Sequence, residues 1–197
     1  MSTAIALPRR AYLTDRWSSS AVGTVVLVVG FAALTAVCAQ ISYQPEGWAV
    51  PITGQTFAVL LSGAALGSVR GTASMALYVL AGICGLHVFA DGAHGWARLT
   101  GSTGGYLIGF IVAAGVVGWA AERGWDRTPL MAWPLFILGL AIIYGIGVPW
   151  LKFSLDKSWS WAIHWGLTVF LAGEVIKVLL SGVLLPGAWR LRRRLEQ

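Results

Sequence analysis

An acid and a base, Glu174 and Lys177, lie three residues apart inside an otherwise apolar stretch near the C-terminus. Residues at this spacing share one face of a helix. A charge at membrane depth is costly, so an intramembrane ionisable pair is a candidate functional site. The alternative is a self-neutralising pair with a structural role. The helix rise of roughly 20 Å between Lys177 and Arg190 places the pair in the leaflet opposite Arg190.

The composition predicts an all-α integral membrane protein. The chain has 197 residues, of which 57% are hydrophobic and 11% charged, and its mean hydropathy is +0.73. Soluble domains carry about 25% charged residues. The net charge is +6, but the basic residues are too scattered to line a groove for nucleic acid. The charge therefore reports on membrane topology and not on a nucleic-acid partner.

The apolar segments predict six transmembrane helices with both termini cytoplasmic. They cover residues 20–41, 55–69, 71–89, 103–121, 130–150 and 161–189. The second is shorter than the ~20 residues that span a bilayer, so it either begins near Val50 or lies at an angle. This topology puts ten basic residues inside and three outside, a positive-inside bias. The inner ones are Arg9, Arg10, Arg16, Arg70, Arg123, Arg127, Arg190, Arg192, Arg193 and Arg194, and the outer ones are Arg98, Lys152 and Lys157.

Three parts of the chain follow from this topology: residues 1–19 as a cytoplasmic leader, 20–189 as the membrane domain and 190–197 as a basic cytoplasmic tail. The leader contains Arg9-Arg10 and so resembles a twin-arginine signal. Such signals export soluble proteins, whereas everything downstream here is hydrophobic. The last apolar run is long for one span. Its first part, residues 161–167, suits an interfacial or re-entrant position, and Gly173 is a candidate start for the final helix.

Polar residues gather in two further stretches on the outer side, residues 50–56 and 101–106. The first holds Gln55 at a Pro/Gly-shaped helix entry. The second reads Gly-Ser-Thr-Gly-Gly-Tyr and offers Thr103, Gly104 and Tyr106. Exposed amides at a helix start can bind an anion or a carbonyl, although both stretches could be simple helix caps. Together with the Glu174/Lys177 pair they suit a small, partly polar ligand that bears a carboxylate.

The sequence predicts neither an enzyme nor a metal site. His87, His94 and His164 lie singly, without a zinc-protease motif, and no P-loop is present. The glycine turn is not a nucleophile elbow. Cys38 and Cys84 have no partners that suggest a disulfide framework. The histidines are predicted to be interfacial residues.

Ala32, Ala36 and Ala39 repeat at helical spacing in the first segment. Small residues on one face let another helix approach closely, so Ala32 and Ala36 form a candidate docking stripe for a partner subunit. Alanine is also common in membrane helices without such a role.

These motifs, in this order, resemble those of the BioY family, the biotin-specific substrate-binding (S) components of energy-coupling factor (ECF) transporters. The resemblance covers residues 20–194 and includes Val-Pro-Ile-Thr-Gly-Gln-Thr at 50–56, the 101–106 turn and Gly-Glu-Val-Ile-Lys at 173–177. It implies a six-helix S-component fold with a biotin pocket closed from outside by the first, third and fifth loops.

The resemblance also implies roles for individual residues. The family's Asp-x-x-Lys contact to biotin corresponds to Glu174 and Lys177, with Glu in place of Asp. The third loop lacks the asparagine that supplies a polar contact in some members, so Asp91, His94 or Arg98 is the candidate replacement. The helix-one pattern that meets the transmembrane coupling subunit corresponds to Ala32 and Ala36.

The expected function is biotin uptake across the bacterial inner (cell) membrane. The chain would capture biotin from outside and deliver it inward with an ECF coupling subunit and cytoplasmic ATPases. Biotin is the transported substrate, and no cofactor is expected. An S component for another vitamin and a solo biotin transporter are the alternatives within transport. From other classes, a membrane enzyme lacks a catalytic motif here, and a scaffold would not need the polar cluster.

Overall fold

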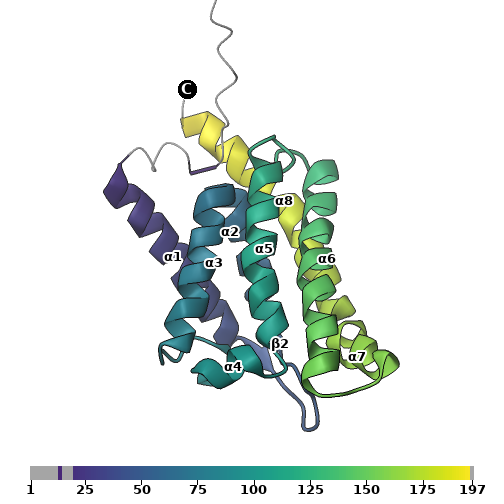
Figure 1. The fold of residues 1–197 in the computed structure, drawn as a ribbon. Helices are drawn as coiled ribbons and strands as arrows, with labels where there is room; N and C mark the ends of the chain where they lie inside the picture. Colours follow the sequence, from purple (N-terminus) through teal and green to yellow (C-terminus); the bar gives the residue numbers. More distant parts are fainter. Residues whose placement is uncertain (1–12, 15–19, 196–197) are drawn as a thin grey trace, which may run out of the picture.

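A computed structural model describes residues 13–14 and 20–195 (Figure 1). Apart from one short β ribbon, the regular structure in this part of the chain is helical, which confirms the all-α class. Arg9, Arg10 and Arg16 of the predicted leader lie outside the described residues. The elements in chain order are α1 Ala21–Gln40, β1 Ser42–Tyr43, β2 Ile52–Thr53, α2 Gln55–Leu66, α3 Ser68–Ile83, η1 Ala90–Gly92, α4 Trp96–Thr100, α5 Gly104–Ala121, α6 Pro129–Ser154, α7 Trp159–Gly166, η2 Thr168–Phe170 and α8 Leu171–Leu195.

Four segments of the described chain are long and apolar enough to cross a membrane: α1, α5, α6 and the α7–α8 segment. The helices α2 and α3 are shorter, with 12 and 16 residues. At 1.5 Å per residue, α2 rises only about 18 Å, less than the ~30 Å of a hydrocarbon core. The short second segment seen in the sequence is therefore a short helix, and it begins at Gln55 and not near Val50.

The long helices form one bundle whose two ends differ (Figure 1). The β ribbon, α4 and α7 gather at one end, and the C-terminal end of α8 lies at the other. We call the first the loop end and the second the tail end. The tight connections are at the tail end, where Gly67 alone separates α2 from α3 and residues 122–128 join α5 to α6.

Helix α5 lies in the middle of the bundle and packs against α2, α3 and α6. Close approach requires glycine at two contacts. A Cβ on Gly63 would collide with the Ala114 carbonyl, and a Cβ on Gly118 would collide with the Gly67 backbone. The helices α2 and α5 therefore pack backbone to backbone, which leaves little room for either to shift.

The last apolar run of the sequence is broken into two helices. Helix α7 starts after Ser158, whose hydroxyl accepts a hydrogen bond from the Trp161 amide, and it ends at Gly166. After the single turn of η2, helix α8 begins at Leu171, two residues before the predicted Gly173. Glu174 thus lies in the first turn of α8, where the positive end of the helix dipole favours a carboxylate.

Helix α1 turns its alanine stripe inward. Ala32 and Ala39 are buried and Ala36 is partly buried against the core, while Val22, Val25, Val26 and Val29 are exposed. Ser74 of α3 donates a 2.9 Å hydrogen bond to the Val28 carbonyl, which ties α1 to α3. The docking role of Ala32 and Ala36 stays a prediction, and the burial of Ala32 favours a packing role for that residue.

At the tail end, the 122–128 connection is bound to α8 through Asp126. Its carboxylate is fully buried, one oxygen accepts a hydrogen bond from the Trp189 indole, and the other oxygen has no partner among the described residues. The guanidinium groups of Arg127 and Arg192 lie 4.9 and 5.2 Å from the Trp189 ring. Burial raises the pKa of Asp126 to about 6, against the weaker opposing effects of the Trp189 hydrogen bond and the charge of Arg127.

Candidate ligand-binding pocket

A cavity opens between the helices near the loop end. It encloses about 620 Å³ of space, part of it open to solvent. The lining comes from the first connection (residues 41–54), α2, the third connection (residues 84–103, which includes α4), α5, α6, η2 and the start of α8. The lining residues are Val50, Pro51, Thr53, Gln55, Thr56, Phe89, Ala90, Ala93, Arg98, Thr103, Tyr106, Leu107, Phe110, Tyr144, Phe170 and Glu174.

Glu174 closes one side of the cavity, and its carboxylate is held by three side chains. The Thr56 hydroxyl lies 2.9 and 3.0 Å from its two oxygens, and the Tyr144 hydroxyl donates to Oε1 over 3.1 Å. Lys177 donates to the same Oε1 over 2.8 Å. Among the described residues, the Thr56 hydroxyl is the only donor near Oε2, and Oε1 competes for the same proton. Oε2 therefore keeps lone pairs for a ligand.

Lys177 supports this carboxylate from behind and does not line the cavity. Its ammonium donates to the Thr53 carbonyl at 2.7 Å, to Thr56 Oγ1 at 2.8 Å and to Glu174 Oε1 at 2.8 Å. These three acceptors match the three protons of a lysine ammonium. Lys177 therefore neutralises the charge of Glu174 and orients both Glu174 and Thr56, without facing the cavity itself.

Gln55 forms a second polar wall. Its carbonyl oxygen accepts from the Thr53 hydroxyl at 2.9 Å, and its amide nitrogen donates to the Tyr78 hydroxyl at 2.7 Å. Tyr78 in turn donates to the Val88 carbonyl in the third connection. One proton of the Gln55 amide has no partner among the described residues, and the side chain lines the cavity.

The glycine turn at 101–106 positions an aromatic floor. The Tyr106 hydroxyl donates to the Gly166 carbonyl at 2.8 Å, so the ring, and not the hydroxyl, faces the cavity. Its ring meets Tyr144 edge-on with centroids 6.0 Å apart, and Tyr144 packs against Phe170 at 6.0 Å. Gly104 does not line the cavity, because it packs against the Leu99 carbonyl and Trp150, where a Cβ would collide.

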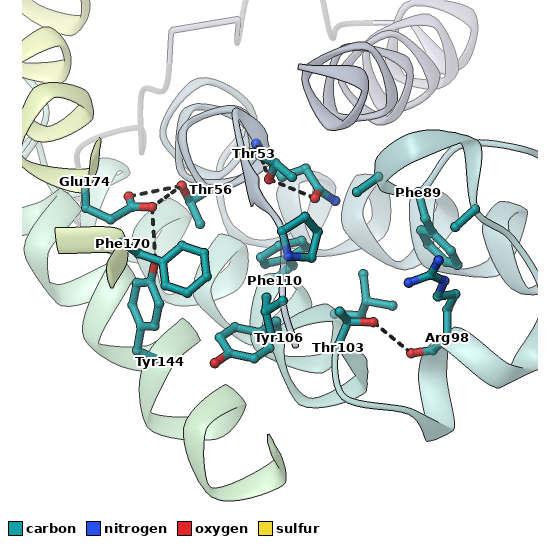
Figure 2. A pocket seen from close by; sticks show the side chains of 16 residues that line it. Thr53, Thr56, Phe89, Arg98, Thr103, Tyr106, Phe110, Tyr144, Phe170 and Glu174 are labelled. Carbon is teal, nitrogen blue, oxygen red and sulfur yellow. Dashed lines mark hydrogen bonds between the residues drawn. The ribbon is translucent and has the colours of Figure 1, made fainter. Parts of the chain in front are cut away.

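Glu174 and Arg98 lie on opposite sides of the cavity, with the rings of Tyr106, Phe110 and Phe170 between them (Figure 2). Arg98 is exposed and comes from α4 at the loop end. Thr103, which also lines the cavity, donates to the Arg98 carbonyl at 3.0 Å. The site thus presents a carboxylate at one side, a cation at the other and apolar rings between.

The connections at the loop end cover the cavity. Trp48, from the first connection, packs edge-on against Trp165 and Phe170, with centroids 5.4 and 6.4 Å apart. The Ser102 hydroxyl donates to the Ala49 carbonyl at 2.8 Å, which fixes the first connection to the glycine turn. At the end of α1, the Gln40 amide donates to the Phe89 carbonyl and accepts from the Gly92 amide, each at 3.1 Å.

Most of the residues predicted from the sequence surround one cavity. Gln55, Thr103, Tyr106, Glu174 and Arg98 line it, whereas Lys177 and Gly104 support it from outside. Of the weak candidates, Asp91 accepts from the Ser42 hydroxyl and His94 packs against His87, so neither reaches the cavity.

Several lining residues were not predicted as site residues. Tyr144 lies in the middle of α6, among apolar residues and outside any motif, and Phe89 and Phe170 read as ordinary membrane aromatics. Thr56 belongs to the 50–56 stretch, and its place one residue after Gln55 was the available signal.

Together, the helical bundle with apolar spans and the cavity at its loop end are typical of a membrane protein for small amphiphilic molecules. The model of the BioY family matches residues 10–194. The chain belongs to the BioY family.

Individual relatives and a solved structure agree with this assignment. The chain is 42% identical over 156 residues to the biotin transporter BioY of Thermotoga maritima, covering 78% of this chain and 88% of the relative. It is 37% identical over 131 residues to biotin transporter BioY2 of Lactococcus lactis, covering 66% and 71%. The fold matches the crystal structure of the S-component for biotin from an ECF-type ABC transporter with a TM-score of 0.78 and 25% identity, covering 87% of this chain and 92% of that one.

Proposed function

We propose that this chain is the substrate-binding membrane subunit for biotin uptake and that biotin occupies the cavity between Glu174 and Arg98. The observation that carries the proposal is this cavity, in a chain whose relatives are named biotin transporters. Biotin combines a ureido group, a fused apolar ring system and a carboxylate tail. Each of these finds a chemical counterpart in the lining.

The orientation of biotin follows from the unused hydrogen-bonding groups. Glu174 Oε2 accepts from a ureido N–H, and the remaining Gln55 amide proton meets the ureido carbonyl. The rings of Tyr106, Phe110 and Phe170 pack against the bicycle. Arg98, at the outer side, attracts the carboxylate of the tail.

Binding of biotin by the purified chain in detergent tests the site, with isothermal titration calorimetry as the readout. Arg98→Ala should weaken biotin binding about three- to tenfold, because a half-solvated ion pair contributes modestly. Biotinamide, which lacks the carboxylate, should bind the native chain and the Arg98→Ala variant equally. Lys157→Ala removes another loop-end cation that does not line the cavity, and it should leave biotin affinity unchanged. Equal losses for biotin and biotinamide would place the tail elsewhere.

We further propose that the chain crosses a bacterial inner (cell) membrane six times, at α1, α2 with the residues that flank it, α3, α5, α6 and α8, with both termini cytoplasmic. The tail end would then be cytoplasmic and the loop end external. The support is the basic bias: Arg70, Arg123, Arg127 and the arginines of α8 belong to the tail end, whereas Arg98, Lys152 and Lys157 belong to the connections of the loop end.

Reporter fusions test this topology. A reporter after Arg194 and one within residues 122–129 should both read cytoplasmic, and one within residues 91–95 should read external. The same side for the second and third reporters would contradict the six-span arrangement.

The expected partners are an ECF coupling subunit and cytoplasmic ATPases, since the matched crystal structure is an S-component of an ECF-type ABC transporter. We propose that α1 faces the coupling subunit, because this helix is apolar and is the least buried of the candidate spans. Within α1, Ala36 is the better placed of the two predicted docking alanines, because Ala32 packs into the core.

A further inference from the structure

We propose that His87 and His94 form a binding site for a divalent transition-metal ion such as Zn²⁺ at the base of the third connection. The two imidazole rings lie with centroids 3.9 Å apart and an interplanar angle of 50°. Both side chains are exposed, so an ion can reach them from the loop end. The remaining histidine, His164, packs against Trp165 in α7 instead.

The geometry suits two nitrogen ligands on one ion. Zn–N bonds of about 2.0–2.1 Å at a tetrahedral angle hold the two nitrogens roughly 3.3 Å apart. Imidazole rings whose centroids are already 3.9 Å apart are close enough for one nitrogen of each to bind the same ion. No third histidine, cysteine or carboxylate joins the pair within the described residues. Water would complete the coordination shell, and the binding would be correspondingly weak.

The backbone holds the two histidines in place. His94 precedes Gly95, whose amide donates to the Gly82 carbonyl at the end of α3 over 2.7 Å. On the other side, His87 follows Leu86, whose amide donates to the Ala81 carbonyl over 3.1 Å. Both imidazoles therefore extend from segments anchored to the same end of α3. This pre-organisation removes part of the ordering cost of binding an ion.

The chain between the two histidines forms part of the pocket wall. Phe89, Ala90 and Ala93 line the cavity. Asp91 and Gly92 have positive φ angles of 56° and 68°, so the segment turns sharply back on itself. An ion that joins His87 to His94 closes this loop at its base. If the cavity binds biotin as proposed above, the bound ion should slow biotin release by restraining that wall.

The first test measures the metal alone. The purified chain should carry no polyhistidine tag, since a tag would bind the same ions, and it should be titrated with Zn²⁺ in the absence of biotin. His87→Ala and His94→Ala should each weaken Zn²⁺ binding by about tenfold or more, since even a change in groups that support a ligand costs 10–100-fold. His164→Ala and Cys84→Ser are the matched controls and should bind as the native chain does. Cu²⁺ bound to the native chain should show two equivalent nitrogen ligands by electron paramagnetic resonance.

A native-like Zn²⁺ affinity in His87→Ala or His94→Ala would overturn the site, and so would an equal loss in His164→Ala. The second test measures the release rate of labelled biotin with and without saturating Zn²⁺. Slower release in the native chain and no Zn²⁺ effect in His94→Ala is the expected result. A chain that binds Zn²⁺ through both histidines but does not bind biotin would refute the proposed function and leave the metal site standing. Zn²⁺ binding without any effect on biotin release would refute the restraint on the wall.

Discussion

Lys177→Ala should weaken biotin binding by about 2–4 kcal/mol, a loss of roughly thirty- to thousand-fold in Kd. The reason is indirect, because Lys177 does not line the cavity and instead donates to Glu174, Thr56 and the Thr53 carbonyl. Without the ammonium, the buried Glu174 carboxylate loses its counter-charge. The carboxylate would then lose the contact that orients it and would offer the ligand a poorer acceptor.

A double-mutant cycle tests this indirect role by calorimetry. Glu174→Ala should also lose affinity strongly, Glu174→Asp should be far milder, and Lys177→Ala combined with Glu174→Ala should be little worse than Glu174→Ala alone. Full additivity of the two alanine losses would mean that Lys177 contacts biotin separately. A purely structural pair gives another pattern: both alanine variants would melt earlier without ligand, while the folded fraction would bind biotin normally.

The second large effect is expected at Asp126. Its pKa is raised to about 6 in the folded chain from 3.8, so the folded state binds a proton more tightly than the unfolded state does. Stability contributed by this group is therefore greatest below pH 4 and falls as the pH rises from about 4 to about 6. The difference corresponds to about 3 kcal/mol. Above pH 6 the ionised carboxylate remains buried, and the cost stays constant.

Asp126→Asn should raise the apparent melting temperature in detergent by several degrees at pH 7.5 and should flatten the pH dependence. The amide oxygen can still accept from the Trp189 indole, and the buried charge is gone. Asp156→Asn is the control, because Asp156 is exposed at the loop end and asparagine tolerates its φ of 50°. A lower melting temperature for Asp126→Asn at pH 7.5, where the native side chain is ionised, would show that the ionised carboxylate stabilises the tail end.

The sequence was sufficient to predict the helical class, the approximate helix positions and most of the polar lining. Hydropathy marks membrane segments because the bilayer excludes unpaired polar groups, and Glu174 and Gln55 stood out because polar residues are rare in such segments. The direction in which a side chain points was harder to predict. Lys177 shares a helix face with Glu174, yet it faces the Thr53 carbonyl, a tertiary contact that no local spacing encodes.

The same limit explains the other differences. Tyr144 reaches the cavity from the middle of α6 because α6 packs against α8, and only the packed bundle brings it to Glu174. Ala32 has the spacing of a docking stripe, but it is buried, whereas α1 as a whole packs against α2 and α3, so its docking role stays a prediction. His87 and His94 look solitary in the sequence, since six residues separate them, and only the folded third connection brings their rings together.

Gln40 connects the loop end of α1 to the pocket wall. Its amide group is bonded to Phe89 and Gly92 on one side of the third connection, and it also donates to the Ala36 carbonyl in its own helix. A tilt of α1 must therefore either move Phe89, which lines the cavity, or break these hydrogen bonds. The two effects are reciprocal. If a tilt of α1 lowers the affinity of the cavity for its ligand, the bound ligand opposes the tilt by the same free energy. A subunit that binds α1 within the membrane and tilts it would therefore promote release of the ligand without touching the cavity.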